Sequence, residues 1–145
     1  MKELSDKLIG AAIEVHKILG PGLLESTYER CLVHELVLRR IHAERQKQQP
    51  INYKGLEIDE GYRIDILVEG KKILELKVVD HLNNIHTAQL LSYLKLSGCR
   101  LGYLMNFNVK LLKDGLKRIV NEYPEEASAL SACSAVDSVE ERATG

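Results

Sequence analysis

Residues 62–79 read YRIDILVEGKKILELKVV and predict a β-hairpin. Alternate side chains of a strand share one face. The apolar positions are Ile64, Ile66 and Val68 in the first arm and Leu74, Leu76 and Val78 in the second. These two sets lie side by side only if the turn has an odd number of residues. We therefore predict a three-residue turn, Glu69-Gly70-Lys71, in which Gly70 can supply a left-handed conformation.

The length of this turn decides which charged residues face each other. With three residues in the turn, Ile66 lies opposite Leu74 and Asp65 lies opposite Glu75. A two-residue turn would instead place Asp65 opposite Leu74 and mix polar with apolar positions. The three-residue turn puts Asp65, Glu75 and Lys77 together on the face opposite the apolar one.

Two carboxylates that face each other repel unless a cation or a proton lies between them. Mg²⁺ or Mn²⁺ suits such a pair, because it binds a few carboxylate oxygens and keeps several waters. Lys77 would stabilise a hydroxide nucleophile or the negative charge that develops at phosphorus, and the Leu76 carbonyl could add a hard oxygen ligand. A solvated strand face with a cross-strand ion pair is the open alternative.

The rest of the chain predicts alternating helices and strands. Apolar residues at helical spacing indicate a helix over residues 3–19, which Gly20-Pro21-Gly22 ends. A second helix is expected over 23–40, with Leu24, Tyr28, Leu32 and Leu36 as its buried stripe. The remaining expected elements are extended segments 44–53 and 56–68, a strand 72–79, a helix 83–96, a strand 100–107 and a helix 111–123. Pro50 predicts an edge or a bend in the first extended segment.

Length and composition indicate one small cytoplasmic domain. The 145 residues fit one core, expected over residues 1–123, and the Ala/Ser/Glu-rich stretch 124–145 predicts a flexible tail. A net charge of −1 gives no global attraction to a polyanion, so nucleic-acid binding would need a local basic patch. The three cysteines form no CxxC pair, and no signal segment or membrane-length apolar run is present.

Several motifs together resemble a known family. Asp65 and Glu75-Leu76-Lys77 are similar to the D…(D/E)xK signature of the PD-(D/E)xK nuclease superfamily, although Ile64 stands where many members have Pro. Residues 22–28, GLLESTY, resemble the motif that names the GxxExxY protein family. Further similar segments, in the order expected of that family, are YRID at 62–65, AQLLSYLK at 88–95 and NFN at 106–108.

The resemblance implies an α/β fold, a single-domain PD-(D/E)xK-like core of αβββαβ order with a mixed sheet flanked by helices. It implies that Asp65 and Glu75 bind the metal, that Lys77 is catalytic and that Glu25 completes the acidic cluster. A helix N-terminal charge is the other interpretation of Glu25. Gln89 and Tyr93, four residues apart on one helix face, would support the site or contact nucleic acid, or would cap the sheet edge. His86, one turn earlier, is a candidate substrate-binding group.

These features predict a divalent-metal-dependent nuclease that uses Mg²⁺ or Mn²⁺. Nucleic acid is the expected partner, DNA rather than RNA; a homo-oligomer is allowed and no membrane is expected. Two other functions stay open: a non-catalytic interaction module on a nuclease-like fold, and a hydrolase of smaller phosphodiesters. A GxSxG elbow, a GK[ST] phosphate loop and a basic recognition helix are all absent from the sequence.

Overall fold

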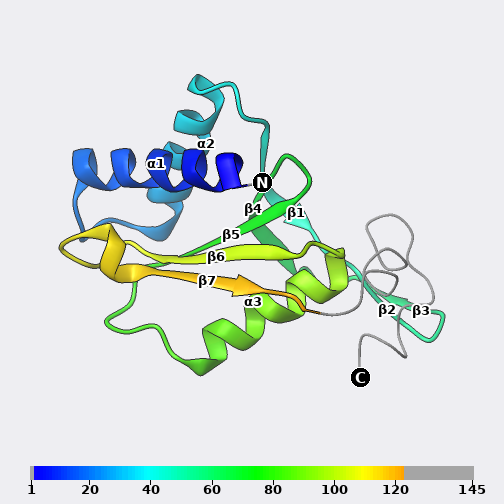
Figure 1. The fold of residues 1–145 in the computed structure, drawn as a ribbon. Helices are drawn as coiled ribbons and strands as arrows, with labels where there is room; N and C mark the ends of the chain where they lie inside the picture. The colour runs from blue at the N-terminus through cyan, green and yellow to red at the C-terminus, as the bar shows by residue number, and fades with distance from the viewer. Residues whose placement is uncertain (1, 123–145) are drawn as a thin grey trace.

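The structure is a computed structural model that describes residues 2–122, in which helices cover both faces of a five-stranded mixed sheet (Figure 1). The strand order is β1-β4-β5-β6-β7, with one parallel pair, β5 and β6, among antiparallel neighbours. The bounds are Ala43–Gln48 for β1, Arg63–Val68 for β4, Lys72–Lys77 for β5, Leu101–Asn106 for β6 and Leu116–Val120 for β7. The predicted α/β architecture is confirmed.

Two hydrophobic clusters hold the three layers together. Helices α1 (Lys2–Leu19) and α2 (Glu25–Leu38) cover one face, where Leu8 and Leu32 pack against Leu74 and Leu76 of β5. Helix α3 (Asn84–Ser97) covers the other face (Figure 1), where its buried residues pack in a second cluster with Ile73, Leu104 and Ile119. Strand β5 is therefore buried on both sides, as is usual for the centre of an α/β sheet.

The hairpin of β4 and β5 has the predicted register. Ile66 pairs with Leu74, and Val68 pairs with Lys72 across the three-residue turn 69–71. Glu69 and Gly70 both have positive φ, 54° and 63°, and the Lys71 N–H donates to the Val68 carbonyl at 2.9 Å. The apolar alternation was sufficient to predict this turn, because a slip of one residue would move every buried side chain to the wrong face.

The prediction that the apolar residues of β4 share one face is wrong for Ile64. Ile66 and Val68 pack on the α1–α2 side, whereas Ile64 belongs to the cluster beneath α3. The strict alternation fails between residues 64 and 66, where the regular pairing of β4 with both neighbours is interrupted at Asp65. The charged face is likewise no solvated surface, since Glu75 is buried.

The helix predicted over residues 111–123 is also wrong. A short 3₁₀ helix, Leu112–Gly115, is followed by β7, which pairs antiparallel with β6 from Val120 opposite Leu101. A Cβ at Gly115 would come within 2.3 Å of the Asn106 carbonyl, so the chain passes close to the end of β6 at a point that only glycine fits. The apolar spacing of this segment suits a helix and an edge strand equally, and the tertiary contact decides between them.

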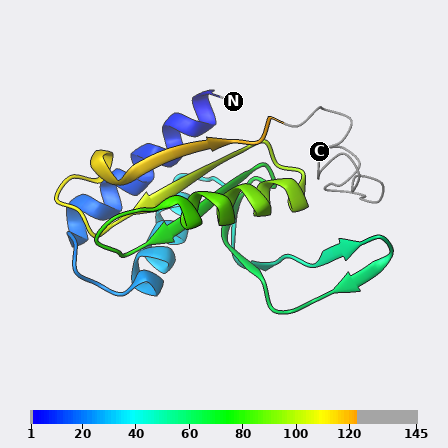
Figure 2. The same ribbon diagram turned by 90° about the horizontal axis from the view of Figure 1, so that it is seen from below.

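The second helix and the extended segments are shorter than predicted. Leu24, expected in the buried stripe, directly precedes α2 and is 73% exposed. The stretch 44–53 divides at Pro50 into β1 and β2 (Ile51–Tyr53), and 56–68 divides into β3 (Leu56–Ile58) and β4. Strands β2 and β3 pair only with each other and project from the body as an arm (Figure 2).

Two other expectations concern the chain as a whole. The predicted flexible tail, 124–145, lies outside the described residues. Within residues 2–122, no helix has the length and apolar character needed to span a bilayer.

Candidate active site

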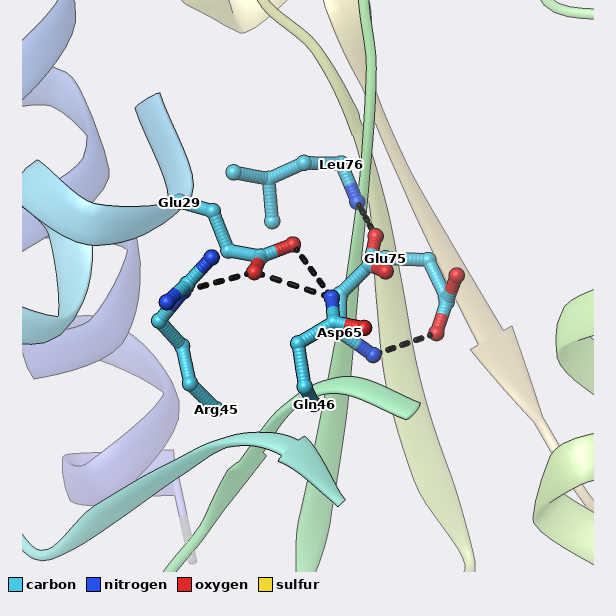
Figure 3. A network of polar contacts seen from close by, with 6 residues as sticks. All are labelled: Glu29, Arg45, Gln46, Asp65, Glu75 and Leu76. Carbon is cyan, nitrogen blue, oxygen red and sulfur yellow. Dashed lines mark hydrogen bonds and ion pairs between the residues drawn. The ribbon is translucent and has the colours of Figure 1, made fainter. Parts of the chain in front are cut away.

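The strands separate around Asp65. Backbone pairing of β4 with β5 ends at Ile66 and Leu74, and the β1–β4 ladder omits Gln46 and Asp65, which its register would place opposite each other. Side chains replace the missing bonds: the Asp65 N–H donates to Glu75 Oε2 at 3.1 Å, and the Leu76 N–H donates to Asp65 Oδ2 at 2.9 Å (Figure 3). Asp65 and Glu75 therefore lie together, as the register predicted.

Both carboxyl groups are strongly perturbed. Burial raises the pKa of Asp65 to about 6; the Leu76 N–H opposes this rise, and the charges of Glu29 and Glu25 add to it. Burial, followed by the neighbouring charge of Asp65, raises the pKa of Glu75 to about 8. Glu75 is only 4% exposed. Such a pair carries excess negative charge when ionised, and a divalent cation is the species that would offset it.

Lys77 lies at the end of β5, where the neighbouring strand fixes its backbone. Its carbonyl accepts from the Phe107 N–H at 2.9 Å. The buried amide of Asn106 makes two bonds to Val79: Nδ2 donates to its carbonyl at 2.9 Å, and Oδ1 accepts from its N–H at 3.1 Å. The charge of Lys77 acts to lower the pKa of Glu25, Asp65 and Glu75, so its ammonium lies within electrostatic range of all three carboxyl groups.

The loop before α2 explains why Gly22, Glu25 and Tyr28 occur at their spacing. Gly22 has φ of 100°, a conformation open mainly to glycine. The buried Tyr28 hydroxyl donates to the Gly20 carbonyl and accepts from the Leu23 N–H, and its ring stacks on Phe107 at 4.6 Å between centroids. Tyr28 thus packs in the core, as expected. The loop fixes the start of α2 and with it Glu25, whose pKa is raised chiefly by burial.

Glu29 is a residue that the sequence analysis missed. It lies one turn after Glu25 on α2, is 3% exposed, and binds Arg45 and Gln46 of β1 (Figure 3). Among the charged groups that raise the pKa of Asp65, Glu29 has the largest effect. The i, i+4 spacing of Glu25 and Glu29 was the available signal, since it puts both carboxylates on one helix face.

The predicted helix pair on the opposite face approaches the same carboxylates. Tyr93 is buried, and Gln89, one helical turn earlier, acts to lower the pKa of its hydroxyl. Burial raises the pKa of Tyr93, and the charges of Glu75 and Asp65 raise it further. His86 has a structural contact: its Nδ1 accepts from the Asn83 N–H at 3.2 Å in the capping box that begins α3. A role for these three side chains in binding substrate stays a prediction.

The carboxylate and carbonyl oxygens of the site suit a hard divalent cation, although the described acidic side chains do not surround one point. Among residues 2–122, no group of three or more His, Cys, Asp or Glu side chains surrounds a point where a metal ion could bind. Asp65 and Glu75 would hold the cation, and each carboxylate has a second oxygen besides the one bonded to a backbone N–H. Glu25 and the Leu76 carbonyl are further predicted ligands. Mg²⁺ needs few protein oxygens, because water and substrate complete its shell.

The comparison with known families agrees with this geometry. Residues 2–119 match the model of the PD-(D/E)XK nuclease superfamily. The chain belongs to that superfamily. The match covers both helices of the first layer, the β4–β5 hairpin, α3, and all but the last residue of β7. No curated protein and no solved structure gives a significant match. Membership of this superfamily suggests nuclease activity, and nucleases of the superfamily act on nucleic acid and generally use divalent metals such as Mg²⁺ or Mn²⁺.

Proposed function

We propose that this protein is a divalent-metal-dependent nuclease that hydrolyses phosphodiester bonds, with Mg²⁺ or Mn²⁺ as the cofactor and DNA as the preferred substrate. One observation carries the proposal: Asp65, which is half-buried, and Glu75, which is buried, meet where two strands separate, and Lys77 follows two residues later on β5. A solvated strand face with an ion pair, the simpler interpretation of these residues, does not fit the burial of Glu75.

Each residue has a role that its position supports. Asp65 and Glu75 hold the cation, which supplies Lewis-acid stabilisation of the phosphate and lowers the pKa of a bound water. The Lys77 ammonium stabilises the negative charge that develops on the phosphoryl oxygens as water attacks phosphorus. Glu25, whose pKa the charge of Lys77 acts to lower, orients this lysine or adds an oxygen ligand. The Leu76 carbonyl is the remaining proposed ligand.

The substrate is proposed to approach across the end of α3. Gln89 is exposed and lies one turn from Tyr93 on α3, so the pair supports the carboxylates or contacts the phosphate backbone. His86, half-buried at the start of the same helix, would extend this contact. The loop that Gly22, Glu25 and Tyr28 form supports placing the chain in the GxxExxY group of the superfamily.

One finding favours a second function, a non-catalytic interaction module. In the part of the chain that the structure describes, the acidic side chains do not surround a cation position, and Glu29 is engaged by Arg45. A nuclease-like fold whose carboxylates hold strands apart without binding metal would have this arrangement. Metal dependence of cleavage distinguishes the two functions.

A cleavage panel tests the proposal. Wild-type protein and Lys77→Ala are incubated with single- and double-stranded DNA and RNA, each with Mg²⁺, Mn²⁺ or EDTA. We expect wild-type cleavage in Mg²⁺ or Mn²⁺ and none in EDTA. Lys77→Ala should retain the wild-type circular dichroism spectrum and lose about 10²-fold or more in rate, as removal of one transition-state charge partner typically does. Absence of wild-type cleavage under every condition favours the interaction module, and wild-type rates in Lys77→Ala remove this lysine from the mechanism.

A further inference from the structure

Strand β1 contains a backbone conformation that its sequence does not require. Gln46, in the middle of the strand, has φ of 53°, in the left-handed region that residues with a Cβ rarely adopt. The pairing of β1 with β4 is regular on both sides, with Arg45 opposite Ile66 and Lys47 opposite Ile64. The interruption is therefore confined to the one position that would face Asp65.

The side chain of Gln46 is directed to α2. Its Nε2 donates to both carboxylate oxygens of Glu29, at 2.9 Å to Oε1 and 3.1 Å to Oε2, and Arg45 Nε donates to Oε1 at 2.7 Å (Figure 3). Glu29 is almost fully buried, so it depends on these partners to replace water. Two consecutive residues of β1 thus donate hydrogen bonds to one carboxylate of α2. In a regular strand they could not, because neighbouring side chains point to opposite faces.

We propose that Glu29, Arg45 and Gln46 form a positioning unit that holds β1 away from Asp65 and so orients the Asp65 carboxylate for the divalent cation. The proposal rests on the proposed metal-dependent function and adds three residues to it. Glu29 is a positioning residue in this account, because both of its oxygens already accept hydrogen bonds. It acts on Asp65 through the opened strand and through its charge.

If Gln46 and Asp65 formed the regular backbone pair of β1 and β4, the structure around Asp65 would change. Gln46 would return to extended backbone, its amide would leave Glu29, and β1 would close on β4 at Asp65. The Asp65 carboxylate would then no longer lie where the strands are separated. Residues that orient metal ligands from outside the coordination shell typically contribute about 10- to 100-fold in metal affinity or activity.

Two substitutions at one position separate the side chain from the backbone. Gln46→Gly keeps positive φ accessible and removes the amide, whereas Gln46→Val removes the amide and disfavours positive φ. Glu29→Gln keeps the size of the side chain and removes the charge that Arg45 pairs with. Gln48→Gly is the matched control, since Gln48 is an exposed residue of the same strand whose amide binds Asp59.

The measurements are Mn²⁺ affinity by calorimetry, kcat and KM for cleavage in Mn²⁺, and the melting temperature. We expect Gln46→Gly and Glu29→Gln to weaken Mn²⁺ binding by about 10-fold or more, and Gln46→Val to weaken it further. Their kcat should fall with little change in KM for nucleic acid, and a higher Mn²⁺ concentration should restore the rate of Gln46→Gly. Gln48→Gly should retain wild-type affinity.

The outcomes distinguish this inference from the proposed function. If wild-type protein binds Mn²⁺ and the three variants bind it equally well, the positioning unit is refuted while the metal site stands. A lower melting temperature without a change in affinity also refutes it, because that result describes a purely structural network. If wild-type protein binds no Mn²⁺, both the inference and the proposed function fail. Should one variant not fold, the other variants and the Mn²⁺ rescue still decide.

Discussion

The two halves of the β4–β5 hairpin differ although they belong to the same pair of strands. Next to the turn, the rungs from Ile66–Leu74 to Val68–Lys72 pair regularly through their backbones. At the other half, side chains of Asp65 and Glu75 take over the bonds to backbone N–H groups. One half is a regular backbone ladder, and in the other half the strands separate around two acidic side chains.

The difference shows how a stable hairpin can carry a costly site. Buried carboxylates destabilise a fold unless hydrogen bonds or a counter-charge offset their desolvation. The regular half fixes the register and packs Leu74 in the cluster beneath α1 and α2, so the open half need not contribute stability. A substitution in one half of the hairpin therefore has a matched control in the other half.

The largest difference should appear in catalysis. Glu75→Gln, in the open half, should lower the cleavage rate by about 10²-fold or more, because it removes a proposed metal ligand that lies opposite Asp65. Glu69→Gln changes the same side chain in the turn and should cleave at the wild-type rate. Initial rates on labelled DNA in Mn²⁺ compare the two, and equal rates would show that the acidic pair takes no part in the reaction.

The free energy of unfolding should respond in the opposite order, with the larger loss from a substitution in the regular half. Leu74→Ala removes a fully buried side chain from the regular half and should lower the free energy of unfolding by about 2–5 kcal/mol. Glu75→Gln should cost far less, or stabilise the metal-free protein, because it replaces a buried carboxyl group, whose ionisation burial disfavours, with a neutral amide of similar size. Chemical denaturation in EDTA measures both variants. A greater loss from Glu75→Gln than from Leu74→Ala would contradict this division of roles.

The pH dependence of stability follows from the raised pKa values. The folded protein keeps a proton on Glu75 up to a pKa of about 8, whereas the unfolded chain loses it near the ordinary value of 4.5. Because the folded state then binds more protons, stability falls as pH rises between these values. In EDTA the melting temperature should drop by roughly 4 °C or more from pH 5 to pH 8. Glu75→Gln should flatten this curve, and a wild-type curve that is already flat would argue against a buried, uncompensated pair.

The smallest effect is expected at the turn. Gly70 has φ of 63°, and a Cβ there would meet no atom within 4 Å. Gly70→Ala therefore introduces backbone strain alone and should cost about 1 kcal/mol, with cleavage unchanged. Thermal unfolding checks the first expectation and the rate assay checks the second. A large loss of activity would mean that the two halves are coupled more tightly than their separate pairing indicates.

The sequence was most informative where a local pattern determines the structure. Alternation of apolar residues predicted the turn 69–71 and the pairing of Ile66 with Leu74, and with them the meeting of Asp65 and Glu75. The pattern could not separate a helix from a strand after Leu111, where the close approach of Gly115 to Asn106 decides the outcome.

The supporting residues of the site were beyond the reach of local patterns. Glu29 and Gln46 are 17 residues apart, and their contact depends on how α2 lies across β1. Positive φ at Gln46 accompanies that contact, and nothing in the sequence AERQKQ favours it. The motif residues were identified by their resemblance to a family, whereas the residues that hold them in place needed the structure.

The most direct test of the central claim is a calorimetric titration of the protein with Mn²⁺. Wild-type protein should show saturable binding, Asp65→Asn should lose it, and the turn control Glu69→Gln should bind Mn²⁺ as wild-type protein does. Binding that survives in Asp65→Asn, or wild-type protein that binds no Mn²⁺ even with DNA present, would contradict the claim that the opened half of the hairpin is a metal-dependent nuclease site.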